Sequence, residues 1–230
     1  MNAKERLVAF VRLARLYSLF DLVMLLVAAK TPPLPLIGAA YMHVGFLGFL
    51  EWRHKQEGRA VPVDLLMWAG MTAAGAQLYG EHRETAWYIL FSITYAWKNE
   101  GYWGLASPFF RGAQTYCLVS AFAPTSFALF AAAAMLIRNV LGDFRDIAAD
   151  RLDEMKTWPV LLGIKEGWLF LHLLSVVATT WLWWVFTVVS AVWPTTLTVN
   201  TLATYYLTPR SSNDRAIAKL QNYARRLHLI

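Results

Sequence analysis

Apolar residues in this chain gather into long blocks, and charged or proline-containing stretches separate the blocks. Several blocks approach the roughly 20 residues that a helix needs to span a bilayer. The pattern therefore predicts an all-α fold, a polytopic transmembrane helical bundle of about eight spans. The predicted helices cover residues 8–29, 35–52, 61–80, 84–98, 106–123, 125–145, 166–187 and 188–208.

The same pattern divides the chain into a membrane domain and a tail. Residues 1–209 hold all of the predicted spans, and residues 210–230 are basic. Apolar side chains in the tail, such as Ile217, Leu220 and Leu227, recur at helical spacing. We expect this tail to be an amphipathic helix that lies on the anionic cytoplasmic leaflet.

Composition and charge agree with a membrane location. Charged residues make up 16% of the chain, whereas a soluble domain carries about 25%. If the predicted loops alternate between the two sides of the membrane, all but two of the 21 Lys and Arg residues fall on the side of the N-terminus. The two exceptions are Lys30 and Arg83. Because positive loops mark the cytoplasmic side, the sequence predicts an integral protein of the cell inner or plasma membrane with both termini cytoplasmic. The net charge of +6 then reflects topology, and we expect no nucleic-acid partner.

Four aspartates follow one another at helical spacing near the sixth predicted span. They are Asp143, Asp146, Asp150 and Asp153. At about 100° per residue they share a helical stripe about 80° wide, where like charges repel one another. A cation between the carboxylates removes this repulsion, and oxygen ligands suit Mg²⁺. Lys156 follows closely, where it can contact a metal-bound phosphate. The alternative is a solvated loop in which the acids pair with neighbouring basic residues, namely Arg145, Arg151 and Lys156.

The residues around these aspartates resemble the second Asp-rich motif of the UbiA superfamily of intramembrane prenyltransferases. In that family an Asp precedes an Arg-Asp pair, an Asp-Arg pair follows, and a basic residue, Thr, Pro and Gly come next. The matching residues here are Asp143, Arg145, Asp146, Asp150, Arg151, Lys156, Thr157, Pro159 and Gly163. Two shorter segments are also similar to the family: Arg15-Leu-Tyr-Ser in the first predicted helix and Tyr95-Ala-Trp-Lys98 at the end of the fourth.

This resemblance implies transfer of a polyisoprenyl group from its diphosphate to a hydrophobic or aromatic acceptor, with Mg²⁺ assisting departure of the diphosphate. The prenyl chain would enter laterally from the membrane lipid. The implied catalytic residues are Asp146, Asp150 and Lys156. The implied diphosphate-binding residues are Arg151, Lys98, Arg15 and Asn139. The implied metal ligands are Asp143, Asp146, Asp150, Asp153 and Glu51.

The chain departs from the family pattern at two places. The first Asp-rich motif is missing after the second predicted helix, where Glu51 is either a replacement metal ligand or an interfacial acid paired with Arg53 or Lys55. The basic tail stands in place of a ninth helix. Two alternatives therefore stay open: a degenerate lipid-binding protein or pseudoenzyme without transferase activity, and a UbiA-type terpene cyclase.

Three further residues lie inside predicted spans. Because an unpaired charge is costly in a bilayer, we expect Asp21 to face the bundle or a wet cavity, in a structural or a substrate-handling role. We expect His43 to be a hydrogen-bonded core residue, with contact to an acceptor as the alternative. The single Cys117 is expected to be a buried, unreactive thiol. The sequence disfavours two other classes of membrane protein. It lacks the glycine-rich elements of a CDP-alcohol phosphotransferase, and Asp21 is the only acid that it offers near the midplane for a channel or transporter.

Overall fold

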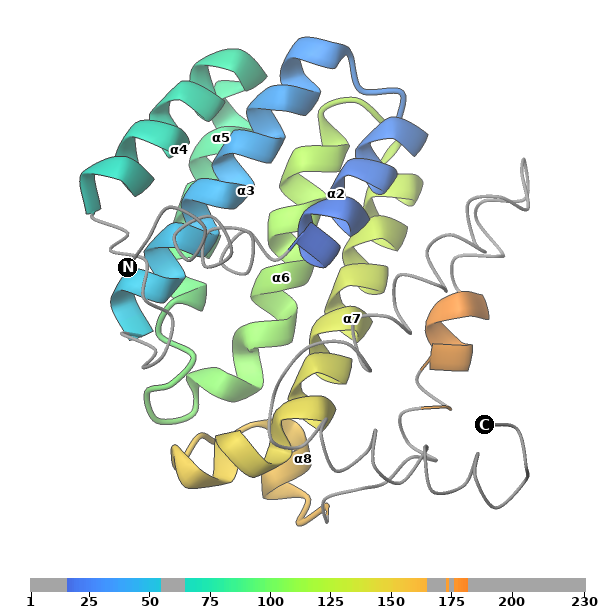
Figure 1. The fold of residues 1–230 in the computed structure, drawn as a ribbon. Coiled ribbons are helices and arrows are strands. Elements are labelled where there is room, and N and C mark those ends of the chain that lie inside the picture. Colours follow the sequence, from blue (N-terminus) through green and yellow to red (C-terminus); the bar gives the residue numbers. More distant parts are fainter. Residues whose placement is uncertain (1–15, 55–64, 165–172, 174–175, 182–230) are drawn as a thin grey trace, which may run out of the picture. The chain divides into compact units, whose positions relative to one another are not determined.

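The computed structural model describes residues 16–54, 65–164, 173 and 176–181 (Figure 1). Within these ranges every regular element is a helix, which confirms the all-α prediction. The helices are α2 (Leu16–Ala28), α3 (Pro33–His54), α4 (Leu65–Tyr79), α5 (His82–Tyr95), α6 (Trp103–Ser120), α7 (Thr125–Leu152) and α8 (Trp158–Leu161). The predictions for Arg15, for most of residues 166–208 and for the tail at 210–230 lie outside the described residues.

Two of the described helices are long and apolar enough to cross a bilayer by length and composition. These stretches are Pro33–Leu50 of α3 and Thr125–Ile147 of α7, and α2 adds the shorter apolar stretch Ser18–Ala28. The helix pattern thus agrees with the sequence over the described ranges. The total of eight spans stays a prediction.

The chain forms two compact units. The first comprises residues 1–96 and 110–133, and the second comprises residues 97–109 and 134–230. The first unit contains α2 to α5, while α6 and α7 each contribute residues to both units. The acidic stripe of α7 and the loop that carries Lys156 belong to the second unit.

In the first unit, α3 and α4 lie side by side in close contact (Figure 1). A Cβ on Gly38 of α3 would lie 2.5 Å from the backbone nitrogen of Tyr79, and a Cβ on Gly75 of α4 would lie 2.7 Å from the carbonyl oxygen of Gly38. Only glycine fits at these two positions. Small residues let helix backbones approach closely, which is a main source of helix association inside a bilayer.

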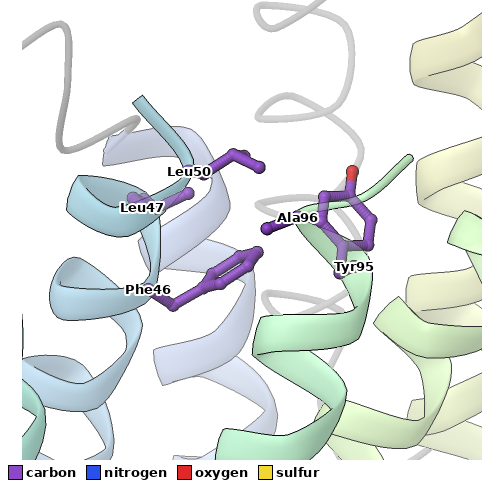
Figure 2. Close-up of a cluster of buried hydrophobic side chains, with 5 residues drawn as sticks. All are labelled: Phe46, Leu47, Leu50, Tyr95 and Ala96. Atoms are coloured by element: carbon purple, nitrogen blue, oxygen red, sulfur yellow. The ribbon is translucent and has the colours of Figure 1, made fainter. Parts of the chain in front are cut away.

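Apolar side chains of α3 and the end of α5 form a core in the same unit. Phe46, Leu47 and Leu50 meet Tyr95 and Ala96 (Figure 2). The rings of Phe46 and Tyr95 make an edge-to-face contact with centroids 5.5 Å apart, a favourable arrangement for aromatic pairs. This cluster fixes the last turn of α5 against α3.

The close contact of α3 and α4 predicts a specific pattern of glycine substitutions. Gly38→Ala or Gly75→Ala should destabilise the protein by about 1–3 kcal/mol, because each new methyl group collides with the facing backbone. Gly70→Ala on α4 is the matched control, since a Cβ there has no neighbour within 4 Å. We expect the first two variants to lower the thermal unfolding midpoint and the control to preserve it. Equal midpoints in all three variants would contradict this packing.

Candidate functional site

Three of the four predicted aspartates, which belong to the second unit, are buried. α7 extends past the predicted end at residue 145 to Leu152, and Asp143, Asp146 and Asp150 on this helix are only 6–7% exposed. Asp153 follows the last helical residue and is exposed. Of the charged groups, Lys98 exerts the strongest electrostatic effect on Asp143, followed by Asp150 and Asp146. Residues some fifty positions apart in sequence therefore act on one another here.

The end of α7 reverses the chain toward its own acidic face. The amide of Met155 donates to the carbonyl of Asp150 at 2.7 Å, and the amide of Glu154 donates to the carbonyl of Arg151 at 3.3 Å. Glu154 adopts the left-handed conformation with φ 54°. These features form a Schellman motif, which satisfies the last carbonyls of a helix and turns the chain back. Met155, the next residue, is buried.

This reversal brings Thr157 and Lys156 next to the helix. The hydroxyl of Thr157 donates to Oδ2 of Asp150 at 3.1 Å, and both residues are buried. The ammonium of Lys156 lies over the ring of Tyr102, 3.9 Å from its centroid. The ammonium is therefore held on Tyr102 by a cation–π contact, while the neighbouring Thr157 ties the loop to Asp150.

Gly104, in the first turn of α6, lets three backbone segments come together. A Cβ at this position would lie 2.8 Å from the carbonyl oxygen of Lys156 and 3.2 Å from that of Lys98. Pro108 lacks the N–H that would bind the Gly104 carbonyl in a regular helix, and the hydroxyl of Ser107 donates to that carbonyl instead, at 2.9 Å. Because Gly104 has no side chain, the backbones of Lys98 and Lys156 can both lie close to the start of α6.

Asp146 is bound to its neighbour Arg145. Nε and Nη2 of Arg145 donate to the two carboxylate oxygens of Asp146, each at 2.8 Å. By contrast, Oδ2 of the buried Asp143 has no hydrogen-bond partner. Among the residues that the structure describes, no three His, Cys, Asp or Glu side chains lie close enough together to hold a metal ion by themselves.

The other predicted site residues make different contacts or belong to the first unit. Arg151 is exposed and donates to the carbonyl of Ile164 at 2.7 Å, and Asn139 donates to the Ser107 hydroxyl at 3.4 Å. Glu51 lies in the last turn of α3, within the first unit. Its role as a metal ligand, like that of Asp153, stays a prediction.

Sequence reasoning found only part of the contacts that hold the acids. It named Arg145 as a partner only in the solvated-loop alternative, it assigned Thr157 only as a member of a motif, and it gave Gly104 and Tyr102 no role. The position of Thr157 is a usable signal. If the helix ends near residue 152, the chain must reverse for Thr157 to reach Asp150. The pair of Arg145 and Asp146 agrees with the alternative in which the acids pair with basic neighbours, although adjacent helix residues do not ordinarily face each other.

A second buried polar cluster lies in the first unit. The Arg111 guanidinium donates to Ser18 at 2.9 Å and to Gln114 at 2.7 Å, and it lies over the ring of Phe46. Ser18 is also hydrogen-bonded to Nε2 of His43 at 3.1 Å. His43 is thus a hydrogen-bonded core residue, as predicted.

Two other residues of the predicted spans are buried in the first unit as well. Asp21 on α2 is fully enclosed, so it faces the protein interior. Cys117 on α6 is buried, as expected for an unreactive thiol.

Comparisons with known proteins add no relative. No family model, no curated protein and no solved structure matches this chain. The functional argument therefore rests on the residues themselves.

The contact between Thr157 and Asp150 predicts how the loop responds to substitution. Thr157→Val keeps the shape of the side chain but leaves the buried Asp150 oxygen without this donor, so we expect a loss of about 1–3 kcal/mol in unfolding free energy. Thr157→Ser keeps the hydroxyl and should retain most of the stability. Thermal unfolding of the purified protein without divalent cations measures both. A valine variant as stable as the serine variant would contradict the importance of this hydrogen bond.

Proposed function

We propose that this chain is an intramembrane prenyltransferase that moves a polyisoprenyl group from its diphosphate to a hydrophobic or aromatic acceptor. One observation carries the proposal: in the second unit Lys98 acts on the buried Asp143, and Thr157, the residue after Lys156, is hydrogen-bonded to the buried Asp150. Cations beside carboxylates suit a diphosphate that carries a divalent ion. The two apolar stretches of α3 and α7 support a location in a bilayer, where a prenyl chain dissolves.

The chemistry that these residues would serve is a substitution at an allylic carbon. The bond between the first prenyl carbon and the diphosphate oxygen breaks, and the diphosphate keeps the electron pair. The acceptor supplies the electron pair of the new bond to that carbon and loses a proton. The ammonium groups of Lys98 and Lys156 would neutralise charge that grows on the leaving group, which is the largest contribution that such a site makes.

Mg²⁺ would neutralise further charge on the diphosphate when bound. In phosphate-transfer sites this ion uses one or two carboxylates and completes its coordination with water and phosphate oxygens. Two acids therefore suffice, and the two that we propose are Asp143, whose Oδ2 is buried without a partner, and Asp150. A buried carboxylate oxygen without a donor is stabilised by a cation.

A second candidate function is binding of an isoprenoid diphosphate without transfer. The pairing of Asp146 with Arg145 favours it, because a central acid of the motif is occupied by a basic side chain. A terpene cyclase would ionise the same diphosphate without an acceptor. Release of diphosphate separates the binder from both enzymes, and the identity of the prenyl product separates transfer from cyclisation.

The test is release of diphosphate from geranylgeranyl diphosphate by the purified full chain, with Mg²⁺ or with EDTA. We expect release only with Mg²⁺, and we expect Asp150→Asn to reduce it about 100-fold, as removal of one electrostatic stabiliser does in other enzymes. Glu154→Gln is the matched control, since Glu154 is exposed and loses the same charge four residues later.

Equal losses in the two variants would show that charge alone, and not the buried position of Asp150, is responsible. If the folded protein binds prenyl diphosphates but releases diphosphate from none of them, whatever their chain length, the chain is the binding protein and not the transferase.

A further inference from the structure

We infer that Arg145 competes with divalent cations for Asp146, so that a cation enters the ligand-free site at Asp143 and reaches Asp146 only after an anion draws Arg145 away. The inference deepens the proposed function and rests on it for the chemistry of the anion, a diphosphate. It separates Asp143 from Asp146, two acids that the sequence analysis names together as implied metal ligands.

The geometry of the pair is the first step. Arg145 and Asp146 are adjacent on α7, and their side chains leave the helix about 100° apart. The guanidinium must therefore fold across the helix surface to reach the carboxylate. It does so with two hydrogen bonds of 2.8 Å, and the side chains of Arg145 and Asp146 are 7% and 10% exposed. A bidentate pair of this kind occupies both oxygens of Asp146.

The environment of Asp143 is the second step. This side chain is 7% exposed, and its Oδ2 has no hydrogen-bond partner. Asp150 and Asp146 both act on it with negative charge, and Lys98 is the strongest positive influence. Burial with like-charged neighbours and an unfilled acceptor is the situation that a divalent cation relieves. Asp143 is thus the acid that the resting structure leaves available.

A diphosphate supplies the reason for the exchange. Arg binds phosphate oxygens with the same planar fork that it presents to a carboxylate. When a diphosphate arrives beside Asp146, Arg145 has an alternative anion, and Asp146 gains a cation as its new partner. Arg145 is a positioning residue in this account, since it acts through the carboxylate that it holds or releases.

Binding of Mn²⁺ alone to the full chain in lipid nanodiscs tests the order of entry, with electron paramagnetic resonance reporting the free ion. Without any phosphate compound, Asp143→Asn should weaken Mn²⁺ binding at least about tenfold, while Asp146→Asn should change it less than about twofold. With inorganic pyrophosphate present, Asp146→Asn should weaken it as well. Equal weakening by both variants in the absence of pyrophosphate would overturn the inference, as would a wild-type protein that binds no Mn²⁺ under either condition.

Variants of Arg145 test the competition directly. Arg145→Gln should tighten Mn²⁺ binding about tenfold without pyrophosphate, the change that one charge-assisted hydrogen bond corresponds to. The gain should vanish in the double variant with Asp146→Asn. Arg145→Lys keeps the charge without the fork and should give a smaller gain, which separates release of Asp146 from loss of a positive charge.

The outcomes of these experiments support or contradict competition between Arg145 and a cation for Asp146. Unchanged or weaker Mn²⁺ binding in Arg145→Gln contradicts the competition. If that variant does not fold, the comparison of Asp143→Asn with Asp146→Asn decides, because it leaves Arg145 in place. Metal binding that follows the expected order in a protein that releases no diphosphate from any prenyl donor would support the inference and reject the transferase.

Discussion

A carboxylate that is buried in an apolar helix needs a donor or a counter-charge, and the second unit is arranged around this need on α7. Asp150 obtains its donor from Thr157, which requires the chain to reverse at Glu154. Asp146 obtains its partner from the next residue along the helix, Arg145. Asp143 lies under the influence of Lys98, which comes from another segment. The reversal and the paired arginine are both consequences of three acids on one buried stripe.

Glycine provides the close backbone contacts on which these pairings depend. In the second unit, Gly104 admits the carbonyl groups of Lys98 and Lys156 at distances that any side chain would prevent. In the first unit, Gly38 and Gly75 do the same for α3 and α4. In both cases the absence of a side chain lets backbone segments approach closely.

Much of this arrangement is readable from the sequence, and the rest is not for identifiable reasons. The apolar blocks place the described helices to within a few residues, and the three-four spacing correctly predicts that Asp143, Asp146 and Asp150 share a face. The apolar block ends near residue 145 because the rest of α7 is polar, so only the three-four spacing of the acids indicates that the helix continues toward Leu152. The partners of the acids depend on rotamers and on contacts between distant segments, which periodicity does not encode.

The two buried polar clusters differ in one respect that bears on function. In the first unit, Arg111, Ser18 and His43 are joined to one another and to their neighbours by hydrogen bonds. In the second, Asp143 retains an oxygen without a partner, the only ionisable group among the orphaned buried polar atoms in the described part of the chain. A neutral hydroxyl in that state costs about 1–3 kcal/mol, whereas an ionised carboxylate costs far more. The cation that we propose would satisfy this oxygen of Asp143.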